Sequence, residues 1–197
     1  MRFGLEFNFP LLPALSALWL FLPGTVTPVL AQQGAAPDKT QLGPRGERNA
    51  REIKYGDWQK FCFKTPGTNM VCRTTISGTW ETGQSAVRMD LIEREGEGSA
   101  RVQLFLPVGL YLQTAAKLSV DQGKAYQIPY VWCLTNACIA GEKANPGLMK
   151  EMETGEKLKL EVVDTNLLTV STLLPLAQFT SVRKAAPTQI FQQDVDE

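Results

Sequence analysis

Four cysteines carry most of the chemistry that this 197-residue chain can offer. They fall into two close pairs, Cys62 with Cys72 and Cys133 with Cys138, and the sequence contains no histidine. Histidine titrates near neutral pH, is the usual base beside a nucleophilic serine or cysteine, and is the commonest metal ligand. Disulfide bonding, metal binding and thiol redox chemistry are therefore the uses of the cysteines to be weighed.

Four cysteines allow three pairings, and the sequence alone does not select one of them. Cys62 and Cys72 lie on consecutive predicted strands, so a bond between them would join the two strands of a hairpin. Cys133 and Cys138 enclose four residues, and Asn136 can supply a left-handed turn residue there. In the chain-entropy model the local bonds contribute about 3 and about 2 kcal/mol, and crossed bonds about 4 to 5 kcal/mol. Hairpin geometry and loop-closure kinetics favour the two local disulfides.

Two other kinds of cysteine site fit the spacing less well. Ligand pairs in zinc ribbons usually sit about two to four residues apart, whereas nine residues separate Cys62 from Cys72. Thiol oxidoreductases usually have about two residues between their cysteines, at a helix N-terminus. Four residues separate Cys133 from Cys138, on a predicted strand and turn. We therefore expect no metal and no other cofactor, with a labile second bond as the narrower alternative.

The remaining catalytic patterns are sparse. Ser181 and Lys184 match the Ser-x-x-Lys spacing of acyl-transfer enzymes, but the companion Ser-Asp-Asn and Lys-Thr-Gly motifs do not follow. The sequence has no nucleophile elbow, phosphate-binding loop or dinucleotide fingerprint. Four carboxylates could form an acid and base pair, although nothing in their spacing indicates it: Asp57, Glu81, Asp90 and Asp121. We expect a protein without enzymatic activity, and a carboxylate-based hydrolase is the least favoured alternative.

The N-terminus predicts export. Arg2 precedes the apolar stretch Pro10–Leu22, which has the length of a signal-peptide core and is shorter than the roughly 20 residues that span a bilayer. Small residues occur within Val29–Ala31, so we predict cleavage after Ala31 and a signal peptide over residues 1–31. The mature chain would be periplasmic, secreted or at the cell surface, where disulfides persist. Glu6 weakens the positive charge expected before the apolar core, which makes a retained anchor the alternative.

Composition predicts one globular domain. Twenty basic and twenty acidic residues cancel, so nothing in the net charge points to nucleic acid as a partner. Residues 32–51 are rich in glycine, proline and charge and nearly free of large apolar side chains, which predicts a disordered linker. Residues 52–187 are long enough for one domain with a single core. Residues 188–197 are predicted to be a flexible tail.

Strand periodicity dominates that domain. Residues 157–163 alternate leucine and valine with lysine and glutamate, and residues 167–174 return after a turn at 164–166, which predicts a β-hairpin. Further runs with strand character occupy residues 58–63, 70–76, 86–93, 101–106, 117–120 and 126–132. We therefore predict a mainly β protein, an antiparallel β-sandwich or partly closed barrel of about eight strands.

One or two short helices complete the predicted fold. Asn145 and Pro146 are typical of a helix start, Gly155 lies just beyond the expected end, and Leu148 and Met152 would share one face. A second short helix is possible within residues 176–184. We expect both to close the ends of the β core.

Aromatic residues divide into two groups by position. Trp58 and Trp132 stand beside the cysteine segments, where covering a disulfide in the core is the simpler role. Trp80 and Tyr111 lie near predicted turns or strand ends, so they are the candidate residues of an exposed binding surface.

An ordered set of landmarks resembles the invasion-associated locus B family over about residues 55–184. The landmarks are Asp57-Trp58, Cys62, Cys72, Leu106-Pro-Val-Gly-Leu110, Asp121-Gln-Gly123, Cys133 to Cys138 with Ala140, and Leu176-Ala-Gln-Phe179. Two positions depart from the family pattern, because Ala137 and Gln178 stand where the family commonly has glycine. A left-handed backbone at either position would be strained.

The resemblance implies a small exported β protein of Gram-negative bacteria, periplasmic or surface-associated, with no established enzymatic activity. In some pathogens such proteins are linked to entry into host cells, including erythrocytes, so host-cell association or invasion is a narrower expectation. The expected partner is an envelope or host-surface protein, with no nucleic acid and at most peripheral membrane association. A periplasmic small-ligand binding module is the alternative function, and the sequence leaves the oligomeric state open.

Overall fold

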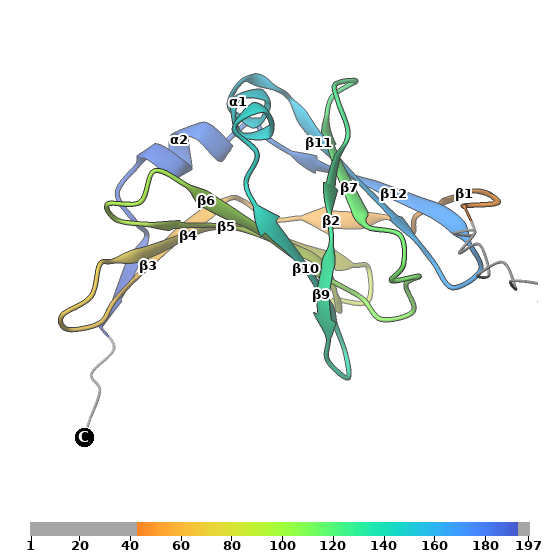
Figure 1. Ribbon diagram of the computed structural model, residues 1–197, viewed down its shortest axis with the longest axis horizontal. Coiled ribbons are helices and arrows are strands. Elements are labelled where there is room, and N and C mark those ends of the chain that lie inside the picture. The colour runs from red at the N-terminus through yellow and green to blue at the C-terminus, as the bar shows by residue number, and fades with distance from the viewer. Residues whose placement is uncertain (1–42, 193–197) are drawn as a thin grey trace, which may run out of the picture. The chain divides into compact units, whose positions relative to one another are not determined.

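A computed structural model describes residues 43–192, which form two β-sheets and two short helices (Figure 1). The strands are β1 (Gly46–Asn49), β2 (Ile53–Tyr55), β3 (Gln59–Lys64), β4 (Val71–Trp80), β5 (Ser85–Arg94), β6 (Ala100–Leu106), β7 (Ala116–Val120), β8 (Tyr126–Ile128), β9 (Tyr130–Cys133), β10 (Cys138–Lys143), β11 (Lys157–Val163), β12 (Leu168–Pro175) and β13 (Gln189–Gln192). The helices are α1 (Pro146–Thr154) and α2 (Phe179–Lys184). The predicted signal peptide, residues 32–42 of the predicted linker and residues 193–197 of the predicted tail lie outside the described residues.

The two sheets form a sandwich around a single core. A five-stranded sheet has the order β1, β12, β11, β7, β8, and an eight-stranded sheet has the order β13, β3, β4, β5, β6, β10, β9, with β2 paired to β4. Leu91 and Leu104 of the larger sheet share one buried cluster with Leu118 and Leu160 of the smaller sheet. The sandwich prediction is confirmed, although the described residues form thirteen strands where about eight were predicted, and they do not close into a barrel.

The predicted hairpin is formed by β11 and β12, and Asp164 shapes its turn. One oxygen of the Asp164 carboxylate accepts hydrogen bonds from the backbone N–H groups of Asn166 (2.9 Å) and Leu168 (3.0 Å). The bond from Leu168 is the main cause that holds the pKa of Asp164 below its usual value. Leu167 occupies the left-handed region at φ 60°. The turn therefore depends on a carboxylate that bridges two backbone donors.

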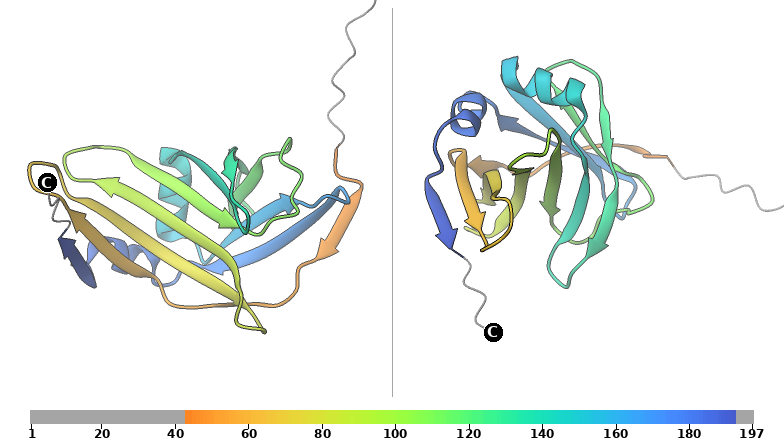
Figure 2. Two further views of the ribbon diagram at one scale, coloured as in Figure 1. Left: turned by 90° about the horizontal axis from the view of Figure 1, so that it is seen from below. Right: turned by 60° about the vertical axis from the view of Figure 1, so that its left-hand side comes forward.

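Both helices cover the same side of the eight-stranded sheet (Figures 1 and 2). The Asn145 side chain accepts a hydrogen bond from the Gly147 backbone (2.8 Å) and caps α1, as the sequence predicts. Leu148 and Met152 lie on the buried face of this helix. Helix α2 lies within residues 176–184, where the sequence suggested a second helix, and its first residue, Phe179, is buried. The helices therefore extend the core beyond the sheets.

The prediction of one continuous strand over residues 126–132 is wrong. The structure divides it into β8 and β9, which belong to different sheets. Pro129 lies between them, and proline cannot donate a backbone hydrogen bond to a strand ladder. The chain therefore crosses from one layer of the sandwich to the other at this residue. Strand β10, which pairs with both β6 and β9, was not predicted.

The structure also places strands in two segments predicted to be unstructured. Strand β1 lies in the predicted linker and pairs in parallel with residues 168–171 of β12. Strand β13 lies in the predicted tail and pairs in parallel with residues 61–64 of β3. Both are edge strands, which are joined through backbone groups whose pairing does not require apolar side chains. The polar composition of the N-terminal segment therefore did not prevent strand formation.

The sequence suggested left-handed backbone at Asn136 and, by the family pattern, at Ala137 or Gln178, and the structure has it at none of these residues. Among the described residues other than glycine, only Asp121 and Leu167 have positive φ. Asn136 therefore does not supply a left-handed residue between the second pair of cysteines. Ala137 instead accepts a hydrogen bond from the backbone of Leu134 (2.7 Å), and Gln178 has φ −100°. The two departures from the family pattern cause no left-handed strain.

Candidate functional site

Two disulfides cross-link two hairpins. Cys62 is bonded to Cys72 and Cys133 to Cys138, which are the local pairs that the sequence favours. In each hairpin the two cysteines are directly opposite one another, with Cα atoms 4.0 Å and 3.9 Å apart. Within residues 43–192 no group of three or more cysteine, aspartate or glutamate side chains could hold a metal ion. The cysteines act as structural cross-links in this domain.

The β9–β10 hairpin forms one margin of the eight-stranded sheet. Strand β9 is last in the strand order, so its outer edge pairs with no other strand among the described residues. Tyr130 anchors the base of the hairpin because its ring packs against the core, and burial raises the pKa of this phenol to about 12. The Cys133–Cys138 bond then closes the far end of the hairpin. The hairpin is held at both ends while its edge stays open.

Exposed apolar side chains gather on this hairpin and the loop beside it. Leu106 pairs with Cys138, so the β6–β7 loop begins next to the hairpin turn. Among the described residues, five of the eight exposed large apolar side chains come from these two segments, and they are 47% to 61% exposed: Val108, Leu112, Val131, Trp132 and Leu134. We call these five residues the apolar end. Clustered exposed apolar residues are typical of interaction sites.

The two tryptophans beside the cysteines have opposite environments. Trp58 is 4% exposed, as predicted. Trp132 is 61% exposed, so the prediction that it covers a disulfide in the core is wrong. Trp132 lies opposite Ile139 and therefore projects from the same side of the sheet as that residue, on the other side from the disulfide. Its exposure follows from the position of β9 at the edge of the sheet, where Val131, Trp132 and Cys133 are all exposed.

The predicted surface residues Trp80 and Tyr111 lie on separate elements. Trp80 ends β4 opposite Ile53, and its side chain is half-buried. Tyr111 lies in the β6–β7 loop between Val108 and Leu112, is half-buried, and donates a hydrogen bond from its hydroxyl to Gln113 (3.1 Å). Among the described residues, no hydrogen bond or ring contact joins Trp80 to Tyr111. Tyr111 shares a loop with the apolar end, and a role of either residue in binding stays a prediction.

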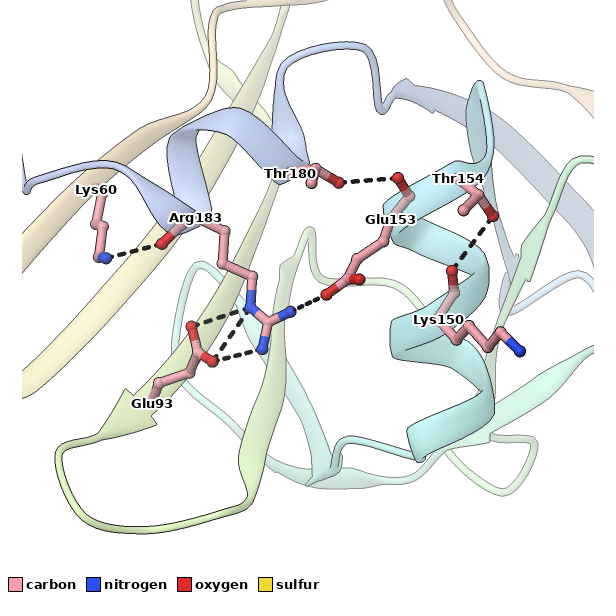
Figure 3. Close-up of polar contacts among 7 residues, drawn as sticks. All are labelled: Lys60, Glu93, Lys150, Glu153, Thr154, Thr180 and Arg183. Atoms are coloured by element: carbon pink, nitrogen blue, oxygen red, sulfur yellow. Dashed lines mark hydrogen bonds and ion pairs between the residues drawn. The ribbon is translucent and has the colours of Figure 1, made fainter.

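A groove of about 1000 Å³ lies on the helical side of the domain, beside α1 and α2. Arg183 of α2 bridges Glu93 of β5 and Glu153 of α1 (Figure 3). Its guanidinium donates to Glu93 at 2.7 Å and 3.2 Å and forms a short contact with Glu153. The bond to Glu93 is the main cause that raises the pKa of Arg183 above its usual value. The cation therefore joins both helices to the sheet.

Further hydrogen bonds hold α2 in place. Lys60 of β3 donates to the backbone carbonyls of Arg183 (2.8 Å) and Ala185 (3.0 Å), at the C-terminal end of the helix. A cation at that end also complements the helix dipole. Thr180 donates to the backbone carbonyl of Glu153 (3.0 Å), as Figure 3 shows. Arg183 therefore has a structural role, because its side chain and its backbone carbonyl tie α2 to α1 and to the eight-stranded sheet.

The groove does not match the patterns expected for the alternative functions. Its lining includes one tyrosine, Tyr126, and no tryptophan, and is otherwise rich in both lysine and glutamate. The two glutamates that meet in it, Glu93 and Glu153, have the Arg183 guanidinium between them. None of the four carboxylates considered as an acid and base pair lines this groove: Asp57, Glu81, Asp90 and Asp121.

A family model decides the relationship of the chain. The model of the invasion associated locus B (IalB) protein family matches residues 58–187. The chain belongs to this family. The match includes all four cysteines and the whole apolar end. No helix within residues 43–192 has the length and apolar character needed to cross a membrane.

A solved structure supports the fold. The domain is similar to the crystal structure of invasion associated protein B from Bartonella henselae, with a TM-score of 0.59 and 20% sequence identity. The similarity covers 66% of this chain and 90% of that chain. A search of the curated proteins finds no match.

Two of the landmarks that resemble the IalB family meet at the apolar end. Residues 106–110 form the start of its loop, and residues 133–138 form its hairpin turn. Sequence reasoning singled out Tyr111 here but missed the four aliphatic residues of the apolar end. Apolar residues outside any strand periodicity, in Pro107–Leu112, were the available signal. The role of Arg183 had no comparable signal, because its partners are 90 and 30 residues away in sequence.

Proposed function

We propose that this protein is exported and acts in the bacterial envelope or at the cell surface by binding another protein through the apolar end. The single observation that carries the proposal is the set of exposed apolar side chains on a hairpin closed by a disulfide and on the loop beside it. Binding a partner with a pre-ordered hairpin costs less conformational entropy than ordering a flexible one. A hydrophobic cluster on a rigid support is therefore suited to protein contacts.

Two disulfides support the export part of the proposal. Disulfides form and persist in oxidising compartments such as the bacterial periplasm and the cell surface. Both bonds link directly opposite strand positions, and the described cysteines include no free thiol. An apolar core of this size, reinforced by two covalent links, fits a domain that remains folded outside the cytoplasm.

The residues of the groove on the helical side favour a function without catalysis. Arg183 lies between Glu93 and Glu153 and keeps both in ion pairs, which leaves neither free to work as an unpaired acid or base. The lining carries a single aromatic residue. Small-ligand pockets are usually lined mainly by apolar and aromatic groups. We therefore place the activity on the apolar end.

Site-specific photocrosslinking in intact cells tests this function. A photoreactive residue at Leu134 should give one discrete covalent adduct, identified by mass spectrometry as an envelope protein. A host-surface protein captured during contact with host cells would extend the proposal to host association. The matched control is a photoreactive residue at Leu173, which is about equally exposed, at 50% against 48%, but lies on the other sheet.

The adduct at Leu134 should decrease when Trp132 is changed to alanine, because the two residues belong to one surface. The same adducts at Leu134 and Leu173, or no adduct at Leu134, would contradict the proposal.

A further inference from the structure

The outer face of the eight-stranded sheet is opposite the side that carries the helices (Figure 2, left). Alternation along β5 places Val87, Met89 and Leu91 in the core and directs Arg88 and Asp90 to this outer face. The outward positions carry five cations on four strands: Arg73, Arg88, Arg94, Arg101 and Lys143. We call these residues the cationic face.

The register arranges these cations in rows. Arg73 is opposite Ile92, Ile92 is opposite Arg101, and Arg101 is opposite Lys143. Because neighbouring strands are about 4.8 Å apart, the backbone positions of Arg73 and Arg101 are roughly 10 Å apart. The outer face therefore presents positive charge at intervals across four adjacent strands.

Asp90 is the acidic residue among these outward strand positions, and it is fully engaged. Its carboxylate accepts a hydrogen bond from Thr75 (2.6 Å) and lies 3.4 Å from the Arg88 guanidinium and 3.8 Å from that of Arg73. Asp90 is buried, whereas about a third of each arginine side chain is exposed. One negative charge is thus shared by two cations, which leaves a net positive charge on this part of the face.

Phenylalanine rings hold the same two arginines flat. The Arg88 guanidinium lies 3.6 Å from the centre of the Phe105 ring, and that of Arg73 lies 5.6 Å from the centre of the Phe63 ring. Stacking on an aromatic ring supports the plane of each guanidinium, whose Nε atom is buried. Pre-ordered guanidinium groups of this kind suit oxyanions, which they can bind with two hydrogen bonds.

Arg101 and Lys143 have no acidic partner within residues 43–192, although they are directly opposite each other. Like charges at opposite positions of a sheet are destabilising, so folding alone does not account for this pair. A Cβ atom at Gly141 would lie 3.2 Å from the Arg101 guanidinium, so glycine leaves room for that group to lie across β10. Both cations are exposed and are therefore available to a negative partner from outside the domain.

A shallow pocket of about 270 Å³ marks the place where such a partner would bind. Its lining includes Arg94, Arg101 and Lys143, together with Ile92 and with Glu97, the ion-pair partner of Arg94. Three cations against one carboxylate make this pocket positive, although the whole chain carries no net charge. Charge complementarity selects an anionic ligand.

We propose that the cationic face binds an anionic glycan, a sugar chain that carries sulfate, phosphate or carboxylate groups. Neutral hydrogen-bonding side chains lie between the rows of cations, including Gln103 opposite Asp90, and they suit sugar hydroxyls. Trp132 ends the row that runs from Arg88 through Phe105 and Ile139, so one exposed ring is available for a sugar to stack on. This surface differs from the protein contact proposed at the apolar end, and the two share Trp132 alone.

The same observations fit other anions less well. A membrane surface requires apolar side chains that protrude into lipid, whereas on this face the exposed Trp132 and Phe191 lie only on the edge strands and Phe105 lies beneath Arg88. Nucleic acid requires a strongly positive domain, and this chain has equal numbers of acidic and basic residues. A face with separated cations and neutral polar groups suits a chain of low charge density.

Binding of a heparin oligosaccharide to the full-length chain, purified with its disulfides intact, tests the proposal. The R101Q/K143Q variant should bind at least about tenfold more weakly, because it loses two charge-assisted contacts. It should also show a smaller dependence of affinity on salt. The urea midpoint of this variant should be unchanged or higher, because the like-charge pair is removed. The R101K/K143R variant keeps both charges and should retain most of the affinity.

The matched control is K124Q/K150Q, which removes two exposed cations from the groove on the helical side. Its affinity should equal that of the unmodified chain. Equal weakening in both double variants, or no binding by the unmodified chain, would overturn the proposal. Equal or tighter binding of duplex DNA, or of vesicles that contain anionic phospholipid, would overturn the assignment to a glycan.

Discussion

Two hairpins of this domain each combine a tryptophan with a cross-strand disulfide, but the tryptophan is buried in one hairpin and exposed in the other. In each, a tryptophan stands shortly before the first cysteine of a cross-strand disulfide: Trp58 before Cys62, and Trp132 before Cys133. Trp58 is 4% exposed and its ring meets Phe179 edge-on at 4.9 Å, whereas Trp132 is 61% exposed. Residue type and distance from a cysteine therefore do not decide burial.

The position of each hairpin in its sheet explains the difference. Strand β3 has neighbours on both sides, β13 and β4, and α2 lies over this part of the sheet. Trp58 therefore enters the core and donates a hydrogen bond from its indole to the carbonyl of Pro175 (2.7 Å). Strand β9 is the last strand, and Trp132 projects from its outward side. Burial depends on whether another element covers the strand.

The two disulfides follow the same division. Cys62 is fully buried, so its bond lies inside the folded structure, whereas Cys133 is exposed. The first bond reinforces a hairpin that is also held by neighbouring strands and a helix. The second bond holds a hairpin that pairs on one side only. The first contributes to the stability of the whole domain, and the second chiefly maintains the shape of an exposed edge.

The largest expected effect comes from Trp58. Changing Trp58 to alanine should lower the free energy of unfolding by about 3 to 5 kcal/mol, because it leaves a cavity beside Phe179. It also removes the donor to the carbonyl of Pro175. Urea unfolding of the purified chain, followed by circular dichroism, measures this loss.

Trp58→Phe is the matched control for that change. It keeps an aromatic ring against Phe179, loses the indole hydrogen bond, and should cost less than the alanine variant. A loss below about 1 kcal/mol for Trp58→Ala would show that Trp58 does not belong to the cooperative core.

Regular alternation and capping residues made part of this fold predictable. The β11–β12 hairpin and α1 follow from side chains that act locally, such as the alternating leucines and the Asn145 cap. Local pairing of the cysteines follows from their closeness in sequence. The division at Pro129 was predictable in principle, because proline interrupts a strand ladder. It was missed because apolar residues on both sides resembled one strand.

Features that depend on distant partners were not predictable. Strand β1 is polar and is held through backbone pairing with β12, about 120 residues away. Arg183 reaches glutamates from two other elements. The exposure of Trp132 depends on β9 being an edge strand, which in turn depends on the topology of the whole sheet. The candidate surfaces arise from the same topology, so only Tyr111 in the adjoining loop was singled out in advance.

Removing either disulfide tests the same comparison between the two hairpins, and it should lower the free energy of unfolding by less than Trp58→Ala does. The C62A/C72A variant should lose about 3 kcal/mol of unfolding free energy and C133A/C138A about 2 kcal/mol, from the lengths of the closed loops. Double variants avoid a free thiol that could mispair. Urea unfolding under identical conditions gives both values.

The site of the change should differ between the two disulfide variants. In C133A/C138A, hydrogen exchange should accelerate most at the backbone amides of residues 131–134, and at the centre of β4 and β5 only by the factor that a loss of about 2 kcal/mol in global stability sets. In C62A/C72A, the loss should appear as a lower global stability. Equal acceleration throughout the sheet in C133A/C138A would show that the edge hairpin is part of the cooperative core.

The smallest effect on stability is expected at Trp132. Changing this residue to alanine should alter the free energy of unfolding by less than about 0.5 kcal/mol, because an exposed side chain loses few contacts in the isolated domain. The same change should reduce the photocrosslinked adduct at Leu134, since it removes the largest side chain of the apolar end. Urea unfolding and the adduct yield, measured on one variant, separate folding from binding. A loss of stability as large as that of Trp58→Ala would show that Trp132 is covered in solution, and the distinction between the two hairpins would then fail.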